Sequence, residues 1–230
     1  MGLTERHILF IPSWYPSSDA PLLGTFFQEQ AAMFAEIGHK VGVLHARFHD
    51  LPSATWLKGP IEPITITEEN NVTVVRASKR LFQPGPFHRI PPIYRLSVRA
   101  REKLALKMYD AYKEINGPPD IIHAKCTMWG AILAKAISDR EKIPYIVTAG
   151  ASVFARGIVG PRERKTAATA LKSANRLLSV SSTLANDLER ILNIPATEFT
   201  TVPNMIDPNK FPFTPPPKNE TFTFGYMANL

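Results

Sequence analysis

The residues best suited to chemistry stand directly after short apolar runs. One such segment carries Trp14 and Tyr15, followed by Gly24 and Thr25 at the predicted start of a helix. A glycine at a helix N-terminus lets an anion or a sugar approach unpaired backbone N–H groups, and the helix dipole favours negative charge there. A tight turn would also explain Gly24, and a role in the core would explain Trp14. Comparable segments follow other apolar runs, at residues 124–129, 148–157 and 203–207.

For several other reactive side chains, an ordinary structural role explains their presence as well as a functional one or better. Arg156 has the charge to hold an acceptor phosphate or carboxylate, although an ordinary surface ion pair explains it almost equally well. His45 and His49 are four residues apart, a spacing that suits a metal only on a helix, and they follow a predicted strand, so we expect no metal site. Cys126 is the single cysteine, which excludes a disulfide framework and a cysteine-built zinc site. Without a partner base beyond His123, it is expected to be a small core or cleft residue.

An alternation of strands and helices must position these residues. Apolar runs predict strands at 7–11, 41–44, 72–75, 121–124, 145–148 and 177–180. Helical spacing predicts helices from 25 to a stop at Gly38, and at 93–115, 129–142, 162–174 and 182–192. This order indicates an α/β fold, a Rossmann-like parallel sheet with helices on both faces. In such sheets, ligands bind beyond the carboxyl ends of the strands, where the segments above lie.

Composition sets the broad class of the chain. Among 230 residues, 44% are hydrophobic and 20% charged, which is typical of a globular protein and excludes a disordered one. The sequence shows neither a signal-peptide layout nor an apolar run of membrane-spanning length, so we expect a cytoplasmic location. Six of the 21 prolines fall between Pro203 and Pro217, which predicts a connector. We therefore expect a domain over 1–205, an interdomain linker over 206–220, and the first strand of another domain over 221–230.

Positive charge is concentrated in one segment. Nine basic residues and one acid lie between Arg76 and Lys107, although the whole chain carries only +7. Four of them form a row at four-residue spacing, Arg95, Arg99, Lys103 and Lys107, beside an apolar row at 96, 100, 104 and 108. A basic ridge beside an apolar stripe suits peripheral attachment to the anionic inner face of a membrane, and a solvated helix face is an equally good explanation. No nucleic-acid motif accompanies the charge, so nucleic acid is not an expected partner.

The order of the strand-end motifs resembles the N-terminal half of GT-B glycosyltransferases of family 4. The motifs are DIIHA at 120–124, IPYIVT at 143–148, ANRLLSVS at 174–181 and PNMIDPNKF at 203–211. Residues 14–16 and 24–26 look like the first strand-to-helix loop of that family. The resemblance covers residues 7 to 230.

The resemblance implies a two-domain enzyme that transfers a sugar from a nucleotide-sugar donor to a hydroxyl acceptor, lipid-linked or glycan, without a metal or other cofactor. In that family the N-terminal domain mainly holds the acceptor, and the C-terminal domain mainly holds the donor. The chain is therefore expected to be an acceptor-side half that is inactive alone, with its donor domain absent. The substrate-binding residues implied are Trp14, Tyr15, Gly24, Thr25, His123, Thr148, Ser152, Arg156 and Asn204. For Asn204, a role at the domain junction is the alternative.

Two departures from the family pattern bear on catalysis. Where the family places a histidine after the strand ending at Thr148, this chain has Gly150, which offers no hydrogen-bonding side chain, so the catalytic residue is unknown. Lys125 replaces the second histidine of the family's H-A-H motif, while His123 is retained. These departures keep a second hypothesis open, a non-catalytic ligand-binding or interaction module with the same fold.

Overall fold

An eight-stranded sheet forms the centre of the protein. The computed structural model describes residues 4–50, 61–81, 90–150, 154, 156–205 and 212–215. The strand order is β3-β4-β2-β1-β5-β6-β7-β8, and every neighbouring pair is parallel except β3 with β4. The strands are β1 (His7–Ile11), β2 (Lys40–Asp50), β3 (Thr65–Glu69), β4 (Val72–Leu81), β5 (Ile121–Ala124), β6 (Tyr145–Ala149), β7 (Arg176–Ser179) and β8 (Phe199–Thr201).

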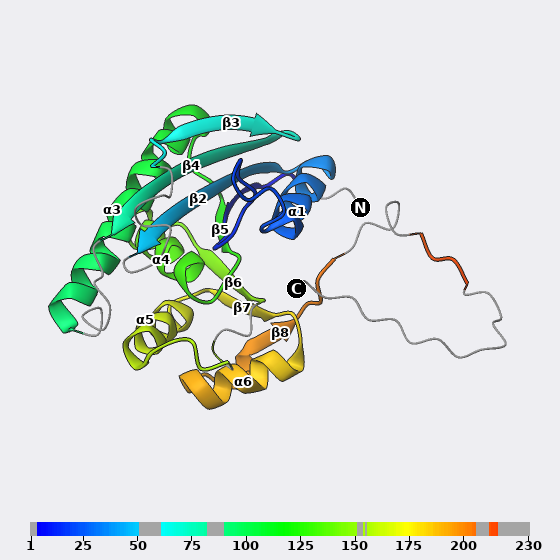
Figure 1. The fold of residues 1–230 in the computed structure, drawn as a ribbon. Helices are drawn as coiled ribbons and strands as arrows, with labels where there is room; N and C mark the ends of the chain where they lie inside the picture. Colours follow the sequence, from blue (N-terminus) through cyan, green and yellow to red (C-terminus); the bar gives the residue numbers. More distant parts are fainter. Residues whose placement is uncertain are drawn as a thin grey trace.

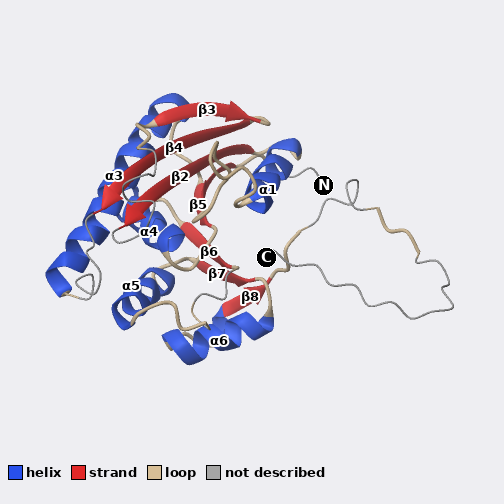
Figure 2. Ribbon diagram, viewed as in Figure 1, coloured by secondary structure: helices blue, strands red, loops and turns tan. Residues whose placement is uncertain are grey.

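Helices cover both faces of this sheet, as Figures 1 and 2 show. One face packs against α1 (Thr25–Glu36), whose Phe27 and Ala31 join a cluster with Phe10. The other face packs against four helices, which are α3 (Pro91–Asn116), α4 (Trp129–Glu141), α5 (Pro161–Lys172) and α6 (Ser182–Leu192). A short 3-10 helix, η2 (Ala196–Glu198), precedes β8. The predicted α/β architecture is confirmed.

The strands are longer and more numerous than the apolar runs predicted. β2 and β4 continue to Asp50 and Leu81, so His45 and His49 lie inside a strand rather than after it, contrary to the prediction. β3 and β8 were not predicted at all. β3 is an exposed edge strand of mixed polarity, and β8 has three residues, so neither shows the continuous apolar run of a buried strand.

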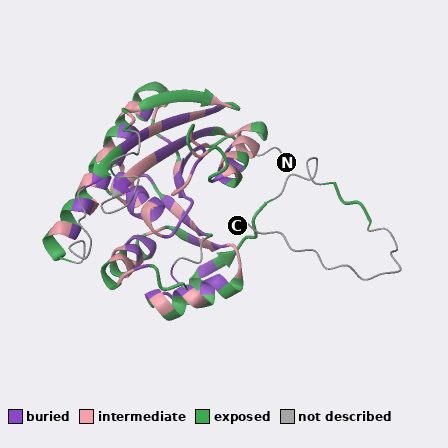
Figure 3. Cartoon of the chain, in the orientation of Figure 1, coloured by how far each residue is buried: buried purple, intermediate pink, exposed green. Residues whose placement is uncertain are grey.

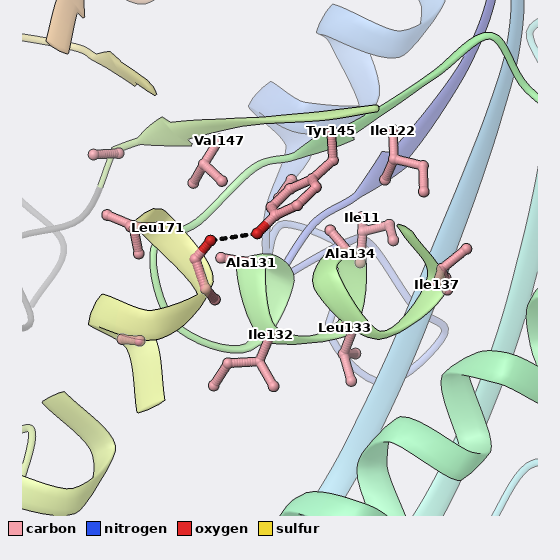
Figure 4. Close-up of a cluster of buried hydrophobic side chains, with 14 of the residues drawn as sticks. Ile11, Ile122, Ala131, Ile132, Leu133, Ala134, Ile137, Tyr145, Val147 and Leu171 are labelled. Carbon is pink, nitrogen blue, oxygen red and sulfur yellow. Dashed lines mark hydrogen bonds between the residues drawn. The ribbon is translucent and has the colours of Figure 1, made fainter. Parts of the chain in front are cut away.

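The larger core lies between the sheet and helices α3 to α6. Figure 3 shows the buried residues following the central strands, and Figure 4 shows how α4 packs beneath β5 and β6. Small side chains such as Ala131 and Ala134 let α4 approach the sheet closely. Tyr145 is buried and donates its hydroxyl hydrogen to the backbone oxygen of Ala170 on α5, which ties β6 to that helix.

The apolar row of α3 is only partly buried. Met108 is buried and Leu104 packs against the core, whereas Leu96 is 64% exposed. The face that packs inward is formed by Tyr94, Ser97, Arg101, Ala105, Met108, Tyr109 and Tyr112. Tyrosine rings and the stem of an arginine bury as much surface as aliphatic side chains do, and the two rows differ by about one residue in rotation. Apolar spacing alone therefore did not identify the most buried face.

Several predictions lie outside the described residues. They include the strand over 221–230, most of the linker over 206–220, and Ser152. The described part of the linker, residues 212–215, has no helix or strand.

Candidate functional site

The loop between β1 and α1 is built around Gly24. This residue is the N-cap of α1 with φ 79°, a left-handed conformation that glycine adopts without strain. A Cβ at this position would lie 2.6 Å from the backbone oxygen of Trp14, so the helix start and the earlier loop segment touch through their backbones. No side chain caps the helix, and its first turn holds no acidic residue. The backbone N–H groups at Thr25 and beyond therefore keep their positive character.

Trp14 and Tyr15 line a pocket of about 210 Å³ at the carboxyl edge of the sheet. Its other walls come from the end of β2 and from the start of α4, with Trp129 and Gly130. α4 begins close to β1, since a Cβ on Gly130 would lie 2.7 Å from the backbone oxygen of Ile11. The N–H of Gly130 donates to Ser13 Oγ at 3.3 Å, which joins this helix start to the β1–α1 loop.

Two ion pairs fix the polar wall of this pocket. Arg47 binds Asp19 at 2.5 Å, and its guanidinium holds the pKa of that carboxyl well below its usual range. Arg76 binds Glu69 at 2.5 Å and donates to the backbone oxygen of Pro16 at 3.2 Å. These contacts tie the β1–α1 loop to β2 and β4.

The buried rings of Tyr15 and His45 lie beside these arginines. The guanidinium of Arg76 lies 5.3 Å from the ring centroid of Tyr15, which is 1% exposed, and burial raises the pKa of that tyrosine. The imidazole of His45 is also buried, 6.1 Å from the Tyr15 ring. Burial, helped by the nearby Arg76 and Arg47, lowers the pKa of His45 to about 4. His45 is thus a neutral hydrogen-bonding group at physiological pH.

Arg101 places positive charge at the opposite wall. It is 1% exposed, and its guanidinium carbon lies 4.8 Å from the ring centroid of Phe48 and 4.2 Å from that of Trp129. Its Nη1 donates to Ser97 Oγ at 2.5 Å. The sequence showed Arg101 only as one charge within a basic segment, because nothing in its spacing indicates that the side chain turns inward.

His123 and Thr148 meet on the face of the sheet that α1 covers. His123 Nε2 and Thr148 Oγ1 are 2.7 Å apart, which joins the ends of β5 and β6 by a hydrogen bond. Burial, with a smaller contribution from the charge of Lys125, lowers the pKa of His123 well below its usual value. Gly150 lies just beyond Thr148 and is exposed. A Cβ on Gly150 would meet Val180 alone among the described residues, at 3.8 Å.

The structure thus divides the predicted residues into separate groups. Trp14 and Tyr15 line the pocket, while His123 and Thr148 bond to each other. Arg156 and Asn204 are exposed, and no described contact joins either of them to those groups. The pocket residues that the sequence analysis did not single out as binding candidates include His45, Arg47, Arg101 and Trp129. Lys125, which was noted only as a departure from a motif, is not among the residues that line this pocket.

Metal-type ligands do not cluster in the part of the chain that the structure describes. There, no group of three or more His, Cys, Asp or Glu side chains could hold an ion. Cys126 is buried, as expected, and burial raises the pKa of its thiol to about 11. Independence from metal remains a prediction.

The basic row on α3 faces outward. Arg95, Arg99, Lys103 and Lys107 are all exposed, and Leu96 projects beside the first of them. A pocket of about 450 Å³ opens between α3, α4 and α5, and its basic lining residues include Arg95, Arg162 and Lys165. Among the described residues, no helix has the length and hydropathy needed to cross a bilayer.

The sequence of the chain matches a known protein family. The model of Glycosyltransferase Family 4 matches residues 23–210, most of the chain, and the chain is a member of this family. The predicted resemblance is confirmed.

Individual relatives match with lower identity. The chain is 28% identical over 193 residues to TuaC of Bacillus subtilis (strain 168), named as a glycosyltransferase of teichuronic acid biosynthesis. That match covers 80% of this chain and 46% of TuaC, so the chain spans about half the length of this relative.

Solved structures give a similar coverage. The HepE protein of Anabaena, in complex with UDP and glucose, matches 92% of this chain and 48% of its own, with 13% identity and a TM-score of 0.48. UGT89C1 of Arabidopsis thaliana, in complex with UDP, matches 90% of this chain and 55% of its own, with 15% identity and a TM-score of 0.43.

Proposed function

We propose that this chain is the acceptor-side half of a GT-B glycosyltransferase, which moves a sugar from a nucleotide-sugar donor to a hydroxyl acceptor. The observation that carries the proposal is the family match over residues 23–210, combined with a pocket at the carboxyl edge of a parallel sheet. The chain spans 46% of TuaC, which leaves room in such a relative for a donor-binding half.

The chemistry of the pocket supports acceptor binding. Aromatic rings such as Trp14 and Trp129 offer apolar faces for a sugar ring, and the neutral imidazole of His45 offers a hydrogen-bonding group. Helix α4 begins at the same wall, where the N–H of Gly130 donates to Ser13 Oγ and so fixes the position of the β1–α1 loop. Sugar transfer needs both substrates aligned and negative charge stabilised on the leaving diphosphate. In this proposal the donor half supplies the groups for the diphosphate, and this half holds and orients the hydroxyl.

The test is sugar transfer by a polypeptide in which the natural reading frame continues past Leu230. We expect release of nucleotide diphosphate and formation of a glycosylated acceptor by the longer chain, and neither by residues 1–230 alone. A longer chain that binds a nucleotide sugar but releases no diphosphate, with or without acceptor, would favour the non-catalytic module instead.

Replacing Gly150 with histidine is expected to raise the turnover of the longer enzyme by about tenfold, since one well-placed hydrogen bond near the reaction contributes about 1–3 kcal/mol. The site accommodates a side chain, because a Cβ there meets Val180 alone among the described residues, at 3.8 Å. Thermal melting should therefore shift little. Gly150→Phe is the matched control, since it adds a ring without polar atoms. Equal turnover by both variants and the parent would show that no hydrogen bond is missing at this position.

We also propose that the outer face of α3 attaches the protein to an anionic membrane surface. Support comes from the exposed basic row Arg95, Arg99, Lys103 and Lys107, from the exposed side chain of Leu96, and from the basic pocket at the start of the same helix. Basic residues attract anionic headgroups, and an apolar side chain beside them can enter the interface. A lipid-linked acceptor would then lie at the surface where the enzyme binds.

Changing the four basic residues of this row to glutamine is expected to weaken binding to vesicles of phosphatidylglycerol and phosphatidylcholine by on the order of a thousandfold, at about 1 kcal/mol per charge. Cosedimentation measures the effect. The matched control removes the same charge elsewhere, from the exposed Arg6, Lys40, Arg176 and Arg190. If both quadruple variants bind alike, attachment depends on net charge and the proposal for α3 fails.

A further inference from the structure

Lys125 is a buried cation at the carboxyl edge of the sheet. Its backbone N–H donates to the oxygen of Ile11 at 3.0 Å, so the residue extends the β1–β5 ladder beyond the end of β5. Side chains alternate along a strand, which places Lys125 on the same face as His123. The side chain is 4% exposed, and its Nζ lies 4.4 Å from the ring centroid of Phe10.

The ammonium group of Lys125 has no anionic partner among the described residues. No hydrogen bond or ion pair joins its Nζ to them, whereas the other buried cation of the site, Arg101, donates to Ser97 Oγ. The attraction of the Phe10 ring offsets only part of the cost of burying a charge. Burial accordingly lowers the pKa of Lys125 to about 7.

The surroundings of Lys125 hold little other charge. Its ionisable neighbour is His123, on the same strand, whose own pKa is lowered so that the imidazole is neutral. The adjacent strands and helix present Phe10 from β1, Thr148 from β6 and the apolar residues of α1. No described carboxylate acts on Lys125, whose pKa responds to burial alone.

The same edge of the sheet carries further positive potential. The uncapped N-terminus of α1 follows β1 on this face, without an acidic residue in its first turn. A buried cation without a counter-charge among the described residues and an uncapped helix start thus both follow strands at the edge where parallel sheets bind ligands.

We infer that Lys125 anchors an anionic group of a bound ligand, a phosphate or a carboxylate, at the carboxyl edge of β5. The inference rests on the proposed function and specifies that one substrate brings negative charge to this half. The incoming anion completes an ion pair with the ammonium, and a charge-assisted hydrogen bond in a dry site is a strong one. Because the bound state holds the ammonium form, binding takes up a proton above about pH 7, and affinity falls as the pH rises further.

The test measures binding of two probes to residues 1–230 by titration calorimetry. Pyrophosphate represents the diphosphate of a donor, and glucuronate represents a carboxylate on an acceptor. We expect one probe to bind about tenfold more tightly to the parent than to Lys125→Met at pH 6.0. This ratio should fall toward one at pH 8.5, where the lysine of the free protein is mostly neutral. Because the probe titrates identically with both proteins, the ratio reports the lysine.

Three further measurements serve as controls for this test. Lys172→Met removes an exposed charge from the end of α5 and should leave binding unchanged. Thermal melting of Lys125→Met should equal or exceed that of the parent, since the variant removes a buried charge. Proton uptake on binding, measured in two buffers of different ionisation enthalpy, should appear in the parent at pH 8.0 and vanish in Lys125→Met.

Clear outcomes would overturn the inference. Absence of binding by both probes, or equal affinity of parent and Lys125→Met at pH 6.0, would show that the lysine is only structural. The proposed function is tested separately, by sugar transfer in the longer chain. Sugar transfer by the longer chain with an unchanged KM in Lys125→Met would reject the anion anchor and leave the proposed function standing. Anion binding that depends on Lys125, without any sugar transfer by the longer chain, would support the anion anchor and reject the proposed function.

Discussion

Replacing Gly24 with alanine is expected to lower the free energy of unfolding by about 3 kcal/mol. The left-handed backbone at φ 79° costs an alanine about 1–2 kcal/mol. In addition, the new Cβ would lie 2.6 Å from the oxygen and 2.7 Å from the carbonyl carbon of Trp14, and overpacking of this kind costs about 1–3 kcal/mol. The atoms involved are backbone atoms, so no rotamer change relieves the contact. Urea denaturation followed by circular dichroism measures the loss.

A matched control separates these two costs. Gly38 also has a positive φ, 94°, but a Cβ there meets nothing within 4 Å. Gly38→Ala should therefore lose only the backbone contribution, about 1–2 kcal/mol. The difference between the two variants is the cost of moving the β1–α1 loop away from α1, and only Gly24→Ala should also weaken ligand binding in the pocket lined by Trp14. Equal losses of unfolding free energy in the two variants would mean that the β1–α1 loop moves away from the new Cβ at no energetic cost.

Stability is expected to rise by about 3 kcal/mol between pH 4 and pH 6.5 through His45 alone. The pKa of His45 is about 4 in the folded protein because burial and two arginines disfavour the imidazolium, whereas an unfolded chain titrates near 6.5. Between these values the unfolded state binds the extra proton, so the free energy of unfolding increases with pH by about 1.4 kcal/mol per unit. The stabilisation is complete above pH 6.5 and is lost as the pH falls toward 4.

The measurement is urea denaturation at several pH values for the parent and for His45→Gln, which keeps a polar side chain without a titrating ring. Other groups change stability over the same range, since burial also lowers the pKa of His123 and of His7. The difference between parent and variant isolates His45. Parallel stability curves for the two proteins would show that folding leaves the pKa of His45 unchanged, contrary to the effect expected from its burial beside Arg76 and Arg47.

The sequence predicted the elements that carry continuous patterns. Helix α6 spans the predicted residues, 182–192, because the capping hydroxyl of Ser181 and the left-handed Asn193 are local signals. Ser181 Oγ accepts from the N–H of Leu184 at 3.2 Å, and Asn193 has φ 54°. The six predicted strands exist because uninterrupted apolar runs are needed where both faces of a sheet are buried.

Features that depend on contacts between distant parts of the chain could not be predicted from the sequence. The inward face of α3 is formed by tyrosines and by Arg101, whose burial depends on the rings of Phe48 and Trp129 in other elements. Edge strand β3 exists because β4 offers it hydrogen-bonding groups, not because its own residues are apolar. The site shows the same division: Trp14 and Tyr15 could be selected from their place after a strand, whereas His45 and Arg47 could not.

The sequence by itself determined the family and the α/β order of elements. Both can be predicted from local apolar runs and from the order of short motifs along the chain. Only the tertiary structure decided which side chains share an environment. It placed His45 beside Tyr15, paired His123 with Thr148, and buried Lys125 without a counter-charge among the described residues. The physical reason is that burial, and with it the pKa of a buried group, depends on what the rest of the chain packs around a residue, and not on the residues next to it in sequence.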